Sequence, residues 1–138
     1  MSAAEYHVHP IGWVRSSLVD LGAAPRQGDE GAPDAELVFA AEFVAGLTDL
    51  QVGETIWVLT WLDRARRDVL VVHPRDDVTR PQRGVFSTRS ADRPNPVGLH
   101  RVEVTSINGS TVRVRNLEAI DGTPIIDVKP TLGPASER

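Results

Sequence analysis

The strongest constraint on the fold is the alternation of side chains on either side of Asn108-Gly109. Before and after this pair, valine alternates with charged or polar residues, at positions 102, 104, 112 and 114. A period of two is typical of a strand with one buried face. Asn-Gly is the usual sequence of a two-residue type I′ turn. The sequence therefore predicts a hairpin over 97–107 and 111–117 with one face in water.

The rest of the chain also consists of short runs that suit strands. We expect strands at 6–15, 36–41, 55–62, 69–73, 85–87 and 125–128. The run Thr55–Leu62 is almost wholly apolar, so it is predicted to be a central strand buried on both faces. Helical spacing is found at Phe43–Leu50, and no segment keeps it beyond about 10 residues. Six to eight short, mostly antiparallel strands with one short helical turn predict a mainly β fold, a small β-barrel or sandwich.

The length of 138 residues suits a single domain, which we expect to span 1–138 with a flexible tail at 132–138. There is no cysteine, which excludes disulfides and thiolate chemistry. The sequence shows no apolar run of about 20 residues and no basic start followed by an apolar stretch. We therefore expect a cytoplasmic protein.

Charge is unevenly distributed along the chain. The net charge of −4 argues by itself against nucleic-acid binding. Nine arginines nevertheless lie between Arg64 and Arg101, against four aspartates, so this window carries +5. The arginines either form a solvated face or gather an anionic partner over a site.

Two segments, Gly84–His100 and Leu117–Pro130, combine a short apolar run with a stiff polar loop. In the first, Asn95 lies between two prolines, whose rings fix φ and lower the entropy of the loop. Arg89 could bind a carboxylate or phosphate through its planar guanidinium, or could form a surface salt bridge. In the second, Asp121–Pro124 could be a structural turn. The same turn could instead hold a ligand through its backbone groups, with Asp121 pairing with an ammonium.

Other chemistries find little support in the sequence. His7 and His9 share one face of a strand, but the remaining histidines lack metal-site spacing, so no metal is expected. Ser87, His100 and Asp92 lack the Gly-x-Ser-x-Gly context of a hydrolase. Neither a Gly-x-Gly-x-x-Gly motif nor a P-loop is present, which argues against a Rossmann or P-loop nucleotide site.

Four stretches carry a specific pattern. They are Pro25-Arg26-Gln27, Val-Phe-Ser-Thr-Arg-Ser at 85–90, Arg-Pro-Asn-Pro-Val-Gly-Leu at 93–99 and Asp-Gly-Thr-Pro-Ile-Ile-Asp-Val-Lys-Pro at 121–130. On these residues the chain resembles the TsaA/TrmO-like family from Ile11 to Pro130. The resemblance implies an S-adenosylmethionine-dependent methyltransferase that acts on N6 of threonylcarbamoyl-adenosine in the anticodon loop of tRNA. It also implies a small β-barrel unlike the Rossmann fold, and a homodimer.

The resemblance assigns cofactor contacts to a set of residues from four segments. They are Pro25, Arg26 and Gln27; Asp63 and Arg64; Arg89 and Leu99; and Asp121, Gly122, Thr123 and Pro124. The acceptor remains open, because longer members of the family carry a C-terminal extension that this sequence lacks. A methyltransferase for a small molecule and a non-catalytic S-adenosylmethionine-binding module are the alternatives.

Methyl transfer from a sulfonium requires the donor and the nucleophile to be aligned at about 3–3.5 Å with water excluded. Arg26 or Arg89 is expected to neutralise the cofactor carboxylate or an acceptor phosphate, and Asp121 to position the donor. N6 of a urea-like group is a poor nucleophile and needs a hydrogen-bond acceptor on its N–H. Asn95 is the first candidate for this catalytic role and Asp127 the second. The arginine window would then carry the anticodon stem-loop.

Overall fold

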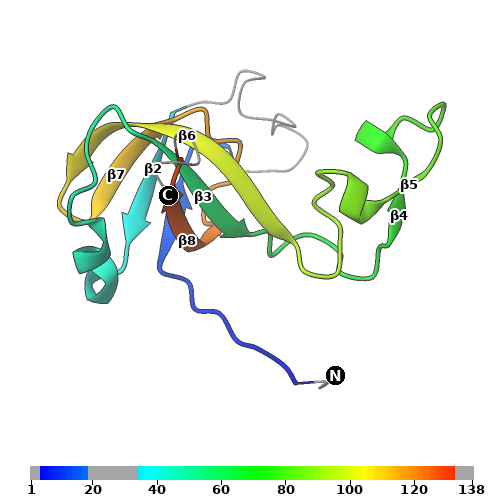
Figure 1. Cartoon of the computed structure of the whole chain (residues 1–138), viewed down its shortest axis with the longest axis horizontal. Helices are drawn as coiled ribbons and strands as arrows, with labels where there is room; N and C mark the ends of the chain where they lie inside the picture. Colours follow the sequence, from blue (N-terminus) through cyan, green and yellow to red (C-terminus); the bar gives the residue numbers. More distant parts are fainter. Residues whose placement is uncertain (1–3, 19–33, 133–138) are drawn as a thin grey trace.

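The chain folds into a ring of six strands, and residues 4–18 and 34–132 are described in this computed structural model (Figure 1). In ring order the strands are β1 (Gly12–Arg15), β2 (Ala35–Phe39), β7 (Thr111–Arg115), β6 (Val97–Asn108), β3 (Thr55–Trp61) and β8 (Pro124–Pro130). Each strand is antiparallel to both of its neighbours, and the pairing of Gly12 with Ile125 joins β1 to β8. The sheet therefore closes into a barrel, and the predicted mainly β fold with antiparallel strands is confirmed.

The core fills the inside of this barrel with β-branched and aliphatic side chains. The four valines at 102, 104, 112 and 114 are each 1% exposed or less, which confirms the alternation predicted for the hairpin. Other fully buried members are Leu37, Ile56, Val58, Leu117 and Ile125. Each such side chain contributes about 1.5–3 kcal/mol through its removal from water. Burial on the inner face of every strand thus fixes the register of the barrel.

Strand β3 differs from its predicted burial. Only alternate residues of the strand, Ile56, Val58 and Thr60, are buried, whereas Trp57, Leu59 and Trp61 are half-buried on the outer face. The prediction of burial on both faces was wrong because the wall of a barrel is one sheet thick. The outer face of β3 is therefore unusually apolar for a surface.

The turn between β6 and β7 also differs from the prediction. Asn108 pairs with Thr111, so Gly109 and Ser110 form the loop. Gly109 has a φ of 60°, and neither Asn108 nor Ser110 has a positive φ. This is the type II′ pattern, with glycine at the first central position, rather than the predicted type I′. The hairpin itself is confirmed.

A long segment at 62–96 projects from the barrel between β3 and β6 (Figure 1), and we call it the extension. It holds the two-stranded sheet of β4 (Val71–Val72) and β5 (Arg83–Gly84). It also holds two 3-10 helices, η3 (Pro74–Asp76) and η4 (Val85–Ser87). The predicted strand at 85–87 is therefore wrong, because these residues form η4. Within it Val85 is buried, whereas Phe86 is 81% exposed.

The one helical turn that the sequence predicted is η2 (Ala41–Leu47), and the two helices of the extension were not predicted. Each of them is only three residues long, so no helical period can develop in the sequence. Strand β1 begins at Gly12 instead of residue 6.

Nowhere in the described ranges is there a helix with the length and apolar character needed to cross a membrane. The predicted tail at 132–138 lies, apart from its first residue, outside the described residues.

Candidate functional site

Three connections leave the barrel at the same end, which we call the loop end. The antiparallel pairing places the C-terminal ends of β1, β3 and β7 beside the N-terminal ends of β2, β6 and β8. The connections 16–34, 62–96 and 116–123 therefore begin and finish together at the loop end. They contain most of the residues that the sequence singled out. Pro25, Arg26 and Gln27 are in the first connection but lie outside the described residues.

The Asp121–Pro124 turn is tied to β1 and to the segment after it. The Asp121 N–H donates to Leu18 O and the Gly122 N–H donates to Val14 O, each at 2.7 Å. One carboxylate oxygen of Asp121, Oδ1, accepts from the Ser16 N–H at 3.0 Å. Asp121 thus joins two of the three connections, and its second oxygen makes no bond to a described residue.

Gly122 and Thr123 of this turn differ in how accessible they are to a ligand. Gly122 has a φ of 85° and open space where a Cβ would stand. Thr123 is 6% exposed, and its hydroxyl donates to Ile120 O at 2.6 Å. The Thr123 side chain therefore stabilises the turn internally. Gly122 is exposed, and because its N–H donates to Val14 O, its carbonyl is the group that faces a ligand. Pro124 begins β8 and fixes where the turn ends.

Asn95 is held by an arginine that the sequence did not single out. The Asn95 Oδ1 accepts from Arg67 Nη2 at 2.8 Å, and Arg67 Nε donates to Pro94 O at 2.7 Å. The guanidinium of Arg67 also lies over the ring of Trp61, 5.2 Å from its centre. Arg67 thereby fastens the Arg-Pro-Asn-Pro loop to β3. It was missed because it lies in a run of arginines without a motif of its own.

The segment Gly84–His100, which we call the central motif, contains two arginines with different contacts, Arg89 and Arg93. Arg93 is half-buried and its guanidinium donates to three backbone carbonyls, those of Ser90, Thr88 and Val85. It is therefore part of the framework of the loop. Arg89 is exposed, and its guanidinium makes no hydrogen bond or ion pair with a described residue. Arg89 is the arginine of this motif that can bind an anion.

The remaining predicted residues fall into two places. Asp63 and Arg64 are exposed and lie at the loop end, one residue after the end of β3. Leu99 and Asp127 lie on the outer wall of the barrel, where both pair with Leu59 of β3. Both carboxylate oxygens of Asp127 are engaged, by its neighbour's N–H at Val128 and by Lys129 Nζ at 3.1 Å. The structure thus brings Leu99 and Asp127 to one row on the outer wall, on strands instead of in the loops.

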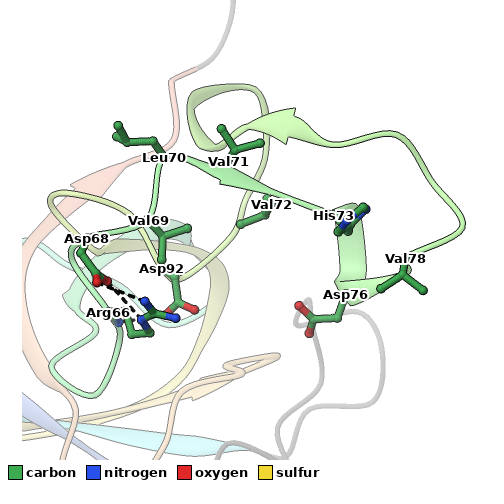
Figure 2. A pocket seen from close by; sticks show the side chains of 10 residues that line it. All are labelled: Arg66, Asp68, Val69, Leu70, Val71, Val72, His73, Asp76, Val78 and Asp92. Atoms are coloured by element: carbon green, nitrogen blue, oxygen red, sulfur yellow. Dashed lines mark hydrogen bonds and ion pairs between the residues drawn. The ribbon is translucent and has the colours of Figure 1, made fainter.

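A concave surface of about 510 Å³ lies in the extension (Figure 2). Arg66, Asp68 and Asp92 lie together on one side of it, and His73 and Asp76 lie on another. Its apolar lining consists of Val69, Leu70, Val71, Val72 and Val78. The hydrogen bond from Arg66 lowers the pKa of Asp68, and Asp68 in turn raises the pKa of Arg66. A second concavity of about 350 Å³ at the loop end contains Arg15, whose hydrogen bond lowers the pKa of Glu36. Both pairs are exposed, so water screens them.

One polar cluster lies inside the barrel. His100 is 4% exposed; its Nδ1 lies 2.6 Å from Glu118 Oε1, and its Nε2 lies 2.7 Å from Thr60 Oγ1. His100 therefore does not contact Ser87 or Asp92, and no hydrolase triad forms from these residues. The alternation of β6 identifies position 100 as inward-facing, but no local pattern indicates its partners.

The family described as the tRNA-methyltransferase O N-terminal domain matches residues 13–135. The chain belongs to this family. The match runs from β1 through the extension to β8, so the loop end lies wholly within it, and the predicted resemblance is confirmed.

Relatives of this N-terminal domain have been described in archaea and bacteria. A probable S-adenosyl-L-methionine-binding protein of Methanothermobacter thermautotrophicus is 44% identical over 130 residues, which is 94% of this chain and 93% of the relative. An S-adenosyl-L-methionine-binding protein of Archaeoglobus fulgidus is 42% identical, over 87% of this chain and 85% of the relative. The crystal structure of TrmO from Pseudomonas aeruginosa superposes with a TM-score of 0.74 at 27% identity. The alignment covers 95% of this chain and 58% of that one, so the chain spans little more than half of the solved TrmO.

Proposed function

We propose that this chain is an S-adenosylmethionine-dependent methyltransferase that holds its methyl donor at the loop end. Membership in the tRNA-methyltransferase O N-terminal domain family supports this proposal, as do the names of its S-adenosyl-L-methionine-binding relatives. The observation that carries it is the Asp121–Pro124 turn. Hydrogen bonds to β1 and to Ser16 fix this turn, and the open space beside Gly122 gives a ligand access to its carbonyl.

The residues at this end fit the chemical groups of the cofactor. S-adenosylmethionine presents a carboxylate, an ammonium, an adenine and a sulfonium, and when bound it supplies the methyl group. Arg89 is an exposed cation for the carboxylate, and the second oxygen of Asp121, which binds none of the described residues, can pair with the ammonium. The Gly122 N–H already donates to Val14 O, so the Gly122 carbonyl is the backbone group that can accept from the adenine amino group. A turn fixed before the ligand arrives lowers the entropy cost of binding.

We further propose that the acceptor is N6 of threonylcarbamoyl-adenosine in a tRNA anticodon loop. The arginines of the extension supply the charge for a phosphate backbone, since residues 62–96 contain eight arginines against five aspartates. Asn95 and Asp127 remain the catalytic candidates for accepting the N6–H. In the free protein Arg67 already binds the Asn95 oxygen, so this oxygen would receive a second donor. Such a substrate would be met in the cytoplasm.

We also propose a homodimer. The extension exposes Phe86 and Val78 at 81% and 78%, and the outer wall of the barrel exposes Leu99 at 39%. Large apolar side chains with this much exposure favour burial against a partner. The positive extension and the more acidic remainder of the chain would attract each other between two copies.

The proposed function is tested in two steps. Calorimetry should show S-adenosylmethionine binding to the wild-type chain, weakened at least about tenfold in Arg89→Ala by loss of a charged contact. Arg80→Ala, which removes an exposed arginine paired with Asp77, is the matched control and should bind like the wild type.

In the second step, tritiated methyl transfer to tRNA from a strain lacking this gene is followed by nucleoside mass spectrometry. Methylated threonylcarbamoyl-adenosine that is absent with Arg89→Ala would support the full proposal. Binding of tRNA should weaken steeply between 50 and 200 mM salt, by roughly 10³-fold for six phosphate contacts. Cofactor binding without transfer to any tRNA would instead favour a small-molecule acceptor or a binding module.

A further inference from the structure

A chain of three polar groups crosses the otherwise apolar interior of the barrel. Thr60 on β3 is 0% exposed and lies 2.7 Å from the Nε2 of His100 on β6. The other ring nitrogen of His100 lies 2.6 Å from Glu118, in the connection between β7 and β8. The chain thus begins in the wall of the barrel and finishes in the loop that carries the Asp121 turn.

Packing alone does not account for a histidine at position 100. The next two inward positions of β6 are Val102 and Val104, and a valine at 100 would fill the same layer without desolvating a polar ring. Removing such a ring and a carboxylate from water is costly unless both are hydrogen-bonded. The sequence also keeps Gly98 beside the pair, because a Cβ there would stand 2.3 Å from Thr60 Oγ1. The polar chain therefore has a use other than filling space.

The place of Glu118 indicates that use. The connection 116–123 belongs to no strand, so side-chain packing and hydrogen bonds hold it in place. Leu117 and Ala119 pack into the core, and polar contacts hold the residues around them. Asp121 and Gly122 are tied to the β1 side through Leu18 O and Val14 O. Glu118 is tied to the opposite wall through His100. Two tethers from opposite sides of the barrel thus hold the turn between them.

We propose that His100 is a positioning residue, which sets the Asp121–Pro124 turn for the methyl donor by holding Glu118 through its Nδ1–H. This inference rests on the proposed function, because it takes the turn to be the cofactor site. His100 is 4% exposed, and both of its ring nitrogens are bonded to Thr60 and Glu118. Its effect must therefore reach the cofactor through the loop.

Two substitutions separate the two hydrogen bonds of the ring. His100→Asn keeps an amide N–H near the position of Nδ1 and can still donate to Glu118. His100→Gln places its amide near Nε2 and can bond only to Thr60. Both remove the ring from the core, so both should lower the melting temperature by a similar amount.

Calorimetry with S-adenosylmethionine then distinguishes positioning from plain stability. His100→Gln should weaken S-adenosylmethionine binding about tenfold. This is the change in dissociation constant that corresponds to the loss of one charge-assisted hydrogen bond. His100→Asn should stay within about threefold of the wild type, because it preserves the tether. Equal losses in both variants, or no loss in either, would overturn the inference.

Amide hydrogen exchange gives a readout that needs no cofactor. The Asp121 and Gly122 amides should exchange faster in His100→Gln and in Glu118→Gln than in His100→Asn. Glu103→Gln, which removes an exposed carboxylate paired with Arg115, is the matched control and should leave these amides unchanged. If wild-type protein binds no S-adenosylmethionine, the proposed function fails, and the exchange data alone decide whether His100 positions the loop. Uniform exchange in all four variants would refute it.

Discussion

At the scale of single residues, the lack of a side chain at Gly98 makes room for two buried polar groups, those of Thr60 and His100. Gly98 lies opposite Thr60 in the register of β3 and β6. A Cβ at Gly98 would be 2.3 Å from Thr60 Oγ1 and 2.7 Å from His100 Nε2. Carbon atoms do not approach oxygen or nitrogen so closely without displacement. The buried hydrogen bond between threonine and histidine therefore requires glycine on the neighbouring strand.

We predict that Gly98→Ala lowers the free energy of unfolding by about 1–3 kcal/mol, the usual cost of overpacking a core. Gly46→Ala is the control, because Gly46 lies in η2 with no atom within 4 Å of a Cβ. It should leave stability unchanged or raise it by about 0.4–1 kcal/mol, since alanine restricts the unfolded chain. Urea unfolding midpoints compare the two. Equal midpoints would mean that the core tolerates a methyl group beside Thr60.

At the scale of elements, the segment Gly84–His100 contains one arginine that holds the loop together, Arg93, and one that is proposed to bind the ligand, Arg89. Arg93 donates to the carbonyls of Ser90, Thr88 and Val85 and so holds η4 against the loop that follows it. Arg89 is exposed on the same loop. A short 3-10 turn has too few hydrogen bonds of its own to persist in water, so the guanidinium of Arg93 replaces them.

We predict that Arg93→Lys lowers the free energy of unfolding by about 1.5–3 kcal/mol, because an ammonium cannot reach three carbonyls in the fixed geometry of a guanidinium. Arg89→Lys should stay within about 0.5 kcal/mol of the wild type and should instead weaken S-adenosylmethionine binding. Thermal unfolding and calorimetry on the same two proteins provide the check. Similar stability losses in both variants would show that Arg89 also belongs to the framework.

At the scale of the whole molecule, a barrel with its own core carries an extension that has very little core. In the extension Leu70, Val71, Val78 and Phe86 are all more than half exposed. Val85 is its fully buried apolar residue among those described. A segment of this kind gains stability by packing against something else, which is why we place it in the proposed dimer interface.

We predict that the chain sediments at twice its mass of 15.0 kDa and that Phe86→Gln weakens this dimer at least about tenfold. Val52→Gln, at a 61% exposed position of the barrel, is the control and should leave the dimer intact. Sedimentation equilibrium over a range of concentrations measures both. A monomeric wild type would refute the dimer, and a dimer unaffected by Phe86→Gln would place its interface elsewhere.

The sequence alone was sufficient where the signal is local. The alternation of valines in β6 and β7 determined the hairpin and its buried face, because side chains of a strand point to opposite sides in turn. The Asp121–Pro124 turn and the loop around Asn95 were found from the same kind of local chemistry. The family followed from those motifs, since their residues are consecutive in the chain.

Tertiary structure decided whatever depends on residues far apart in the chain. Asn95 and Arg67 are 28 positions apart, and His100 and Thr60 are 40 apart, so no window of sequence shows either pair. The outer face of β3 was mistaken for a buried one because an apolar run does not reveal whether a second layer covers it. Closure of the barrel brought the three connections to one end, since antiparallel pairing aligns strand ends that the sequence keeps apart.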